Sequence, residues 1–356
     1  MKKTLKIVLI VLLALAVIAL AYFAYVLLDY HRIGDQTLTV EGQTGAAAQT
    51  DTAYDVVSWN VGFGAYTADY DFFMDGGTQS WAESPERLDA NLADISSRLA
   101  EQAADFYLVQ EVDTNATRSY HRDEREPIIS ALGSGYCRSF AQNYDSPFLM
   151  YPLTQPHGAS EAGLMTFSRF DIVAAERREL PIENTLMKLL DLDRCYSVQT
   201  IPTADGKTLY LYNFHLSAYT SDGTIATEQM KLLLAEMQEH YAAGDYCIAG
   251  GDFNKDVLGD SSVYFGKADQ EYTWAQPIAA ELFENCDIRL IAPLDAEHPV
   301  PSCRNPDSAY HAGQYVLTVD GFLASANVQV ERSEVLDYGF AYSDHNPVRM
   351  RFTLVG

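Results

Sequence analysis

Two polar residues follow a short apolar run near the middle of the chain, and their types could do chemistry. Residues 246–249 indicate a buried strand, and Gly250 and Gly251 would let the backbone turn sharply. Asp252 and Asn254 come next, and side chains two residues apart in an extended chain point to the same side. A carboxylate can take up a proton or hold a hard metal ion, and an amide can donate to an oxyanion. The plainer alternative is an Asx-type turn in which both side chains cap backbone groups.

The same kinds of side chain recur where other apolar segments end. These positions are Asn60, Glu111, His215, Asp320, and the neighbours Asp344 and His345. Carboxylates and amides, with no cysteine among them, suit a hard cation such as Mg²⁺, Mn²⁺ or Ca²⁺. Histidines beside carboxylates suit proton transfer near neutral pH. A hard cation next to a His–Asp pair is the apparatus of phosphate ester hydrolysis, which is therefore the function that these residues predict.

Six short motifs carry these residues, and they occur in a characteristic order. The motifs are Ser58-Trp59-Asn60, Gln110-Glu111, His215-Leu216, Gly251-Asp252-Phe253-Asn254, Val319-Asp320-Gly321 and Ser343-Asp344-His345-Asn346-Pro347. Over residues 54–354 they resemble the endonuclease/exonuclease/phosphatase superfamily, which includes deoxyribonucleases of the pancreatic type, abasic-site endonucleases, sphingomyelinases and inositol polyphosphate 5-phosphatases. The resemblance implies an α/β fold, a four-layer α/β/β/α sandwich of two mixed sheets with helices outside.

The resemblance also implies roles on the metal-binding side of such a site. Glu111 resembles the family's metal-binding carboxylate, with Asn60 beside it and Asp344 as an additional acid. The implied cofactor is a divalent cation, with Mg²⁺ favoured over Mn²⁺ and Ca²⁺. Asp252 and Asn254 resemble the pair that orients the attacking water and contacts the phosphate.

Two histidines would complete the catalytic set. His345 resembles the histidine that faces the scissile phosphate, with Asp320 as its carboxylate partner. His215 resembles the second histidine of the deoxyribonuclease and sphingomyelinase branches. A carboxylate beside an imidazole stabilises the imidazolium, so we expect Asp320 to raise the pKa of His345.

The charged residues that follow Glu111 have a plainer interpretation. Asp113, Arg118 and Arg122 are expected to be solvated loop residues, although the guanidinium of Arg118 has the geometry to bind a substrate phosphate. Arg194 is a second candidate contact of the same kind. The chain shows neither the basic DNA-gripping loops of the nucleases nor an obvious exposed aromatic hairpin like that of the secreted sphingomyelinases.

Helices and strands alternate through the part of the chain that must position these residues. Residues 54–60 and 105–111 indicate apolar strands with polar ends, and a helix is expected to begin at Pro85 with Ser84 as its N-cap. Further strands are expected at residues 163–168, 197–201, 208–214, 316–323, 328–330 and 348–354, and a second helix at 227–241. A helix between strands favours a layered α/β arrangement, with each polar residue at the end of its strand.

The first 28 residues differ from the rest of the chain. Three lysines precede residues 7–28, which contain no charged residue and are long enough for a membrane span of roughly 20 residues. We predict a cytoplasmic N-terminus at residues 1–6, an uncleaved transmembrane signal-anchor at 7–28, a linker at 29–52 and a catalytic domain at 53–356. With the lysines on the cytoplasmic side, we expect a single-pass protein of the cell membrane with an extracellular catalytic domain. A cleaved signal peptide is the alternative, with Ala19 and Ala21 as its small residues.

Acidic residues outnumber basic ones by 49 to 24, which gives a formal net charge of −25. This charge disfavours long nucleic acids as substrates, because their binding needs basic grooves against the phosphate backbone. Phospholipid headgroups and small phosphate esters are therefore favoured, with nucleic acid kept as an alternative. A second class of function is a catalytically inactive binding or scaffolding ectodomain. We expect the protein to be a monomer.

Overall fold

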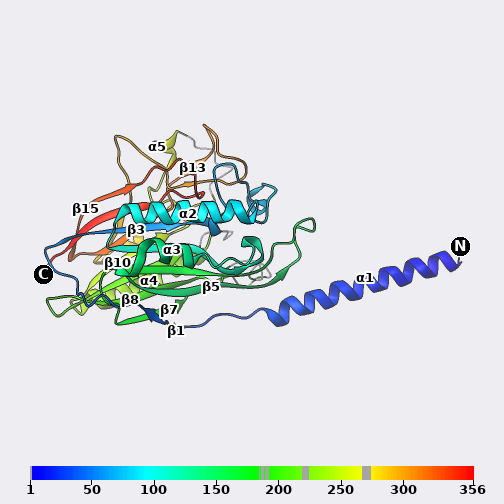
Figure 1. Cartoon of the computed structure of the whole chain (residues 1–356), viewed down its shortest axis with the longest axis horizontal. Helices are drawn as coiled ribbons and strands as arrows, with labels where there is room; N and C mark the ends of the chain where they lie inside the picture. The colour runs from blue at the N-terminus through cyan, green and yellow to red at the C-terminus, as the bar shows by residue number, and fades with distance from the viewer. Residues whose placement is uncertain (1, 184, 186–187, 189–191, 219–223, 267–273) are drawn as a thin grey trace.

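The computed structural model describes residues 2–183, 185, 188, 192–218, 224–266 and 274–356. After an N-terminal helix, α1 (Lys2–Asp29), these residues form two seven-stranded sheets that stack face to face (Figure 1). The first sheet has the order β1 (Gln36–Thr37), β7 (Ala174–Glu179), β8 (Cys195–Pro202), β9 (Thr208–His215), β10 (Tyr246–Asp252), β14 (Asp320–Ser325) and β11 (Ile288–Ile291). The second has the order β15 (Val328–Val335), β16 (Val348–Leu354), β3 (Ala53–Asn60), β4 (Phe106–Ala116), β6 (Gly158–Ser168), β5 (Cys137–Leu149) and β2 (Val40–Glu41).

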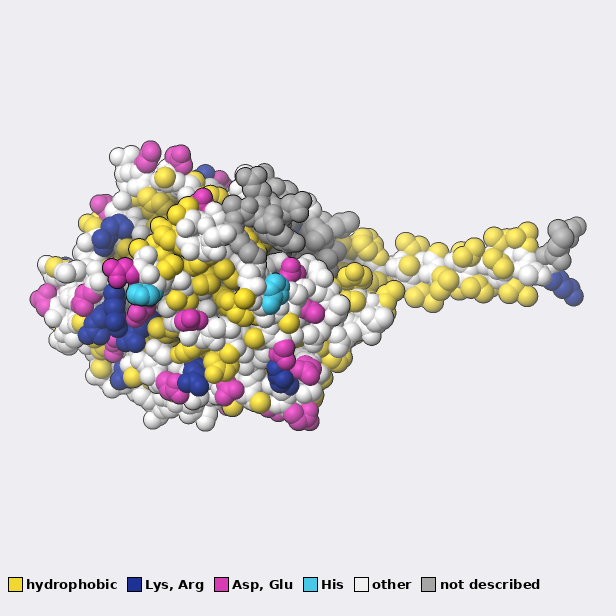
Figure 2. Space-filling model, turned by 90° about the horizontal axis from the view of Figure 1, so that it is seen from above, with side chains coloured by type: hydrophobic (Ala, Val, Ile, Leu, Met, Phe, Trp, Pro, Cys, Tyr) yellow, Lys and Arg dark blue, Asp and Glu magenta, His cyan; other side chains and the backbone are white. Residues whose placement is uncertain are grey.

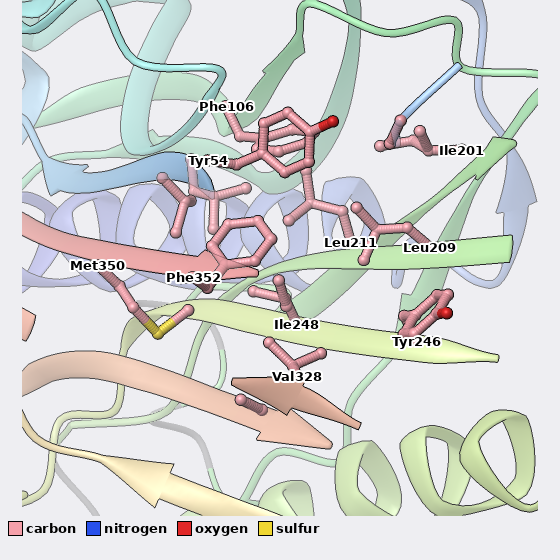
Figure 3. Close-up of a cluster of buried hydrophobic side chains, with 14 of the residues drawn as sticks. Tyr54, Phe106, Ile201, Leu209, Leu211, Tyr246, Ile248, Val328, Met350 and Phe352 are labelled. Carbon is pink, nitrogen blue, oxygen red and sulfur yellow. The ribbon is translucent and has the colours of Figure 1, made fainter. Parts of the chain in front are cut away.

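Apolar side chains from both sheets meet between them and form the main core (Figure 3). Strand β16 shows how the sequence produces this layer, because Val348, Met350, Phe352 and Leu354 are buried and alternate with more exposed residues. The facing sheet contributes Leu209, Leu211, Tyr246 and Ile248 to the same cluster. Each such side chain contributes about 1.5–3 kcal/mol when it leaves water, so the core holds the two sheets in a fixed relation.

Helices cover the outer face of each sheet, and the predicted four-layer α/β/β/α sandwich is confirmed. Helices α2 (Pro85–Gln102) and α3 (Arg125–Leu132) pack on β3 and β4, and α4 (Thr224–Ala242) packs on β9 and β10. Helix α2 begins as predicted, since the hydroxyl of Ser84 accepts a hydrogen bond from the backbone nitrogen of Arg87 at 3.1 Å. The short helix α5 (Ser262–Phe265) lies beside a ribbon of β12 (Cys303–Arg304) and β13 (Val316–Leu317).

Strand direction brings the predicted polar residues to one edge of the sandwich. Strand β3 runs parallel to β4 and β9 runs parallel to β10, so Asn60, His215 and Asp252 lie at carboxyl ends on the same side. The prediction of one strand over residues 316–323 is wrong, because β13 ends at Leu317 and Asp320 is the first residue of β14. Since β14 is antiparallel to β10, with Asp320 opposite Asp252, its beginning reaches this edge too.

The prediction that a strand ends at Glu111 is also wrong, because β4 continues to Ala116. The pairing of β4 with β6 is interrupted between Val109 and Val112, and Glu111 has a φ of 56°. A β-bulge of this kind turns one residue out of the ladder without ending the strand. Glu111 therefore reaches the site from within β4.

Residues 29–52 pack on the sandwich instead of forming the predicted linker. Strands β1 and β2 extend one edge of each sheet, and Ala48 is fully buried beside Thr203. Asp171 accepts hydrogen bonds from the backbone nitrogen and hydroxyl of Thr44 at 2.7 and 3.1 Å. Such polar contacts do not affect the spacing of apolar residues in the sequence, so the sequence predicts a linker here.

Helix α1 projects away from the sandwich (Figure 1). The stretch Lys3–Asp29 is long and apolar enough to cross a membrane. Its sides are hydrophobic and a basic side chain lies at its free end (Figure 2), whereas its last turns contact the domain and bury Val26. The helix is thus a candidate membrane span, and a signal sequence would meet the same criteria of length and composition.

Candidate active site

The amide of Asn60 links the two sheets at the polar edge. Its Nδ2 atom donates to Glu111 Oε1 at 3.0 Å and to Asp252 Oδ2 at 3.1 Å, so one side chain joins β4 of one sheet to β10 of the other. The backbone nitrogen of Gly62 donates to Asn60 Oδ1 at 3.0 Å, which fixes the direction of the amide. The two carboxylates are thereby held at a set distance from each other.

His215 lies against the same carboxylates. Its Nε2 atom is 3.5 Å from Asp252 Oδ2 and 4.0 Å from Glu111 Oε1. Burial lowers the pKa of His215 well below its usual value, and the positive charges of Arg194 and His345 act in the same direction. His215 is therefore neutral at physiological pH and can both donate and accept a hydrogen bond.

His345 and Asp320 form a close charge pair in the site. His345 Nδ1 lies 2.8 Å from Asp320 Oδ2, and the same oxygen accepts from Ser302 Oγ at 2.7 Å. Burial by itself would lower the pKa of His345, but Asp320 is the main counter-charge and the net effect raises that pKa well above its usual value. The other ring nitrogen, Nε2, points to Asp252 Oδ2 at 3.8 Å. A protonated imidazole thus lies beside a buried carboxylate.

Asp252 and Asn254 are held by an unusual local backbone. The backbone nitrogen of Asn254 donates to Asp252 Oδ1 at 2.8 Å, and Asn254 Nδ2 donates to the carbonyl of Leu216 at 2.8 Å. Asn254 has a φ of 48°, which non-glycine residues adopt rarely and which clusters at functional sites. Burial raises the pKa of Asp252 to about 7, although the charge of His345 opposes that rise. The expected Asx-type bond therefore exists, and the side chains still face the cavity.

Asp344 and Glu111 form the acidic side of the cavity. Burial raises the pKa of Asp344, His345 opposes this shift, and the negative charge of Glu111 adds to it. A divalent cation would relieve this repulsion, and carboxylate and amide oxygens are the donors that hard cations prefer. Asp252, Asp320 and His345 also bring possible ligand atoms within 4.8 Å of one another. Asp320 is already engaged by His345 and Ser302. Asn60 does not fit its predicted place as a metal ligand, because its N–H group faces Glu111 and its oxygen accepts from the backbone nitrogen of Gly62.

The two candidate phosphate-binding arginines have different surroundings. Arg118 is not the solvated residue that the sequence predicts, because Asp113 accepts from its Nε and Nη2 atoms at 3.0 and 2.8 Å and both residues are buried. Its guanidinium lies 3.9 Å from the centre of the Phe63 ring. Arg122 is exposed as expected. Arg194 is buried and lines the same cavity as Arg118.

A cavity of about 180 Å³ joins these groups. All of the predicted site residues line it except Asn60 and Asp320, which lie directly behind Glu111, Asp252 and His345. The rest of the wall combines aromatic and apolar side chains with charged ones. The first group includes Tyr66, Phe72, Met74, Tyr144 and Trp274, and the charged residues are Asp75, Glu183, Lys188 and Arg304. The sequence does not identify these wall residues, because most of them come from loops with no regular spacing and Tyr144 comes from within β5.

Cys303 is a site residue that the sequence also leaves unmarked. Its Sγ atom lies 3.6 Å from His345 Nε2, and the two residues form an isolated antiparallel bridge. Burial raises the pKa of the Cys303 thiol to about 12, so the thiol stays protonated. The contact depends on the pairing of β12 with the loop before β16, which no local motif reports.

Comparison with known proteins agrees with this geometry. A model of the Endonuclease/Exonuclease/phosphatase family matches residues 57–345. A search of curated proteins found no match. An endonuclease/exonuclease/phosphatase from Beutenbergia cavernae aligns with a TM-score of 0.55 and 17% identity, over 85% of this chain and 72% of that one.

Two further solved structures have a similar fold. The human Nocturnin catalytic domain with bound sulfate aligns with a TM-score of 0.54 and 18% identity, over 89% of this chain and 97% of that one. ANGEL2, a 2',3'-cyclic phosphatase in complex with adenosine-2',3'-vanadate, aligns with a TM-score of 0.56 and 16% identity, over 89% and 98%. At these identities the alignments establish a shared fold.

Proposed function

The chain belongs to the endonuclease/exonuclease/phosphatase family, whose members hydrolyse phosphate esters, and on this premise we propose that it is a membrane-tethered, divalent-metal-dependent phosphoesterase. The observation that carries the proposal is the single cavity in which a His345–Asp320 pair faces Asp252, with Glu111 and Asp344 alongside. A cation held by Glu111 and Asp344, with Asn60 positioning Glu111 through its N–H group, would supply charge neutralisation on a phosphate oxygen.

The residues around His345 would carry the proton transfers. We call His345, Asp320, Asp252 and Asn254 the histidine side of the cavity. Asp252 is buried and retains its proton to higher pH than an ordinary carboxyl group, so it suits the orientation and deprotonation of a water molecule. Asn254, fixed by its bonds to Asp252 and Leu216, would help to hold the phosphate. His345, kept protonated by Asp320, would stabilise the developing negative charge.

Three further side chains would bind the phosphate group around this pair. His215 is neutral and within reach of the same carboxylates, so it would hydrogen-bond a phosphate oxygen. Arg118 and Arg194 line the cavity and would add positive charge. Asp113 already takes two hydrogen bonds from Arg118, which leaves that arginine a smaller share of the contact.

The N-terminal helix would anchor the enzyme in the cell membrane. We propose residues 1–6 on the cytoplasmic side, 7–28 as the span, and the sandwich outside the cell, because basic residues flank the cytoplasmic end of a span. Residues 29–52 then belong with the sandwich and the catalytic domain of residues 53–356. We further propose that the protein works as a monomer.

The substrate class follows from charge and location. A net charge of −25 opposes the binding of long nucleic acids, whereas lipid headgroups and small phosphate esters carry little charge to be repelled. Two proteins of similar fold were solved with such groups, Nocturnin with a bound sulfate and ANGEL2 in complex with adenosine-2',3'-vanadate, which supports a phosphate ester as the substrate here. Mg²⁺ is the proposed cation, because the carboxylates of Glu111 and Asp344 offer oxygen ligands.

Turnover of a simple phosphodiester tests the proposal. The full chain in detergent is assayed with bis-p-nitrophenyl phosphate in Mg²⁺, Mn²⁺ or Ca²⁺, and EDTA is expected to abolish hydrolysis. Asp252→Asn is expected to be inactive, whereas Asp287→Asn, which neutralises an exposed carboxylate outside the cavity, should match the parent chain. No turnover of any phosphate ester under any of these metals would favour the binding or scaffolding ectodomain instead.

A further inference from the structure

Apolar side chains gather at the tip of the hairpin that joins β5 and β6. Phe148, Met150, Tyr151 and Leu153 are 39%, 44%, 69% and 81% exposed. Single exposed apolar residues are ordinary, but four within a six-residue tip form a patch that marks an interaction site. We call residues 148–153 the apolar tip.

The apolar tip is bonded to the candidate membrane span. The hydroxyl of Tyr22 in α1 donates to the carbonyl of Phe148 at 3.2 Å and accepts from the nitrogen of Met150 at 2.9 Å. The hydroxyl of Tyr25 accepts from the nitrogen of Phe148 at 3.0 Å. Tyrosines occupy the boundary between lipid and water, because the ring is apolar and the hydroxyl is polar. The tip therefore continues the surface of a helix that could cross a bilayer.

The chain after α1 fixes the angle between the helix and the domain. His31 Nε2 lies 3.2 Å from Asp145 Oδ2, and Arg32 Nη2 donates to the carbonyl of Leu180 at 2.8 Å. These contacts begin two residues after the helix ends at Asp29. The sandwich must therefore follow the orientation of α1.

The cavity lies close to this junction. Lys188 lines the cavity, and its Nζ atom is 5.7 Å from the ring centre of Tyr30, the residue after α1. On the other side, the ring of Phe73 lies 4.8 Å from that of Phe72 in the cavity wall and 5.7 Å from that of Tyr151 at the tip. Aromatic contacts thus connect the cavity wall to the apolar tip.

Helix geometry gives the depth of the tip in a bilayer. At about 1.5 Å per residue, the roughly 20 residues that end at Leu28 cover about 30 Å, the thickness of the hydrocarbon layer. Tyr22 then lies about 9 Å inside the outer boundary. A tip bonded to Tyr22 reaches the zone, about 5–10 Å deep, in which interfacial side chains are buried.

We propose that the apolar tip is a second membrane contact, inserted in the same bilayer as α1, which turns the mouth of the cavity toward the lipid headgroups. The proposal rests on the proposed function for its anchor and for its chemistry, and it deepens that function by naming the substrate. A phosphate ester in a lipid headgroup can reach a cavity in this orientation by lateral movement.

Fluorescence quenching tests the contact without any need for turnover. The full chain carrying Leu153→Trp is reconstituted in phosphatidylcholine vesicles with brominated chains, and the fluorescence added by the new tryptophan should be quenched. Val263→Trp is the matched control, because Val263 is 72% exposed on α5, on the side of the domain away from α1 (Figure 1). Equal quenching at the two positions, or none at position 153, would overturn the proposal. Retention of the parent chain on vesicles after an alkaline wash reports on α1 separately.

A charged tip tests the consequence for the substrate. The double variant Tyr151→Asp/Leu153→Asp should hydrolyse sphingomyelin, phosphatidylcholine or phosphatidylinositol in vesicles about tenfold more slowly, the effect of losing roughly 1.4 kcal/mol of apolar docking. Hydrolysis of soluble bis-p-nitrophenyl phosphate should not change. Equal loss on both substrates, or a parent chain that hydrolyses only the soluble ester, would overturn the assignment. A parent chain with no turnover at all contradicts the proposed function, and quenching still decides for or against the tip.

Discussion

The two sides of the cavity solve opposite electrostatic problems. On the histidine side, His345 has a carboxylate at 2.8 Å, and Ser302 donates to that carboxylate, so the charges balance within the protein. On the acidic side, Glu111 and Asp344 repel each other, and the repulsion helps to raise the pKa of Asp344. Asn60 donates one hydrogen bond to Glu111 but carries no charge, so it does not balance the charge of Glu111.

Folding alone balances the charges on the histidine side, whereas the acidic side needs a bound cation to balance its charges. A balanced pair is ready before substrate arrives, which is how preorganised groups stabilise a transition state. Two neighbouring carboxylates repel each other until a cation binds between them and offsets their charge. The histidine side should therefore respond to mutation alone, and the acidic side should respond to mutation and metal concentration together.

The largest expected effect is on the histidine side. His345→Ala should lower kcat/KM by about 10²–10⁴, the usual contribution of a general acid or base. Added metal should not restore the activity, because the lost group is part of the protein. Hydrolysis of bis-p-nitrophenyl phosphate measures this, with His240→Ala as the control, since His240 stacks on Tyr210 on the outside of the first sheet.

The pair can also be tested as one unit. If Asp320 acts only through His345, the double variant His345→Ala/Asp320→Asn should be little worse than His345→Ala. Losses that multiply would show that the two residues act independently, and full activity of His345→Ala would remove the histidine side from the mechanism.

A smaller effect, of a different kind, is expected on the acidic side. Glu111→Gln keeps the shape of the side chain and removes a charge, so activity at ordinary metal concentration should fall by about 10². A metal titration should recover part of that activity, unlike the loss in His345→Ala. An unchanged metal dependence in Glu111→Gln would make the two sides alike and break the comparison.

The pH profile should distinguish the sides further. Asp320 raises the pKa of His345, so the imidazolium persists to higher pH. Asp320→Asn removes this stabilisation, and the alkaline limit of activity should move to lower pH by about one unit or more. Profiles of kcat/KM for the parent chain and the variant measure the shift. A shift to higher pH would contradict the role given to the imidazolium.

The smallest effect concerns stability without substrate. In EDTA, Glu111→Gln should unfold at the same temperature as the parent chain or a slightly higher one, because it removes a repulsion. Asp320→Asn should unfold at a lower temperature, because it leaves the buried His345 without its partner. Mg²⁺ at about a hundred times its Kd should stabilise the parent chain by about 2.7 kcal/mol and Glu111→Gln by less. Calorimetry measures both, and equal stabilisation would exclude Glu111 as a ligand.

Local sequence predicts the parts of this site that short-range chemistry determines. The buried strand predicted over residues 246–249 is present and carries Asp252 at its end, but the predicted turn at Gly250 and Gly251 is wrong, because both glycines pair inside β10. A side chain at Gly251 would collide with the carbonyl of Phe214, so close strand packing explains that glycine. Ser84 and Pro85 show the start of α2, and the cap is present. These features depend on the backbone preferences of a few neighbouring residues, so they are readable from the chain.

Features that depend on distant pairing are not readable in the same way. Asp320 begins a strand because β10 lies opposite, and Glu111 leaves its ladder because β6 continues beside it. Arg118 is buried because Asp113 receives its guanidinium, although both residues look like solvated loop charges in the sequence. The sequence shows no obvious exposed aromatic hairpin, yet Phe148 and Tyr151 are exposed on the hairpin between β5 and β6, and its contact with Tyr22 depends on the fold.

The amide of Asn60 has a consequence for quality control in this molecule. It donates a hydrogen bond to a carboxylate from each sheet, at 3.0 and 3.1 Å, so both bonds form only when the two sheets are correctly aligned. A misfolded form with one sheet displaced by a single residue would remain compact and keep much of its apolar packing, but Asn60 would not make both hydrogen bonds. Such a form would be inert toward substrate, so an incorrectly assembled copy would be inactive and would not hydrolyse the wrong bond.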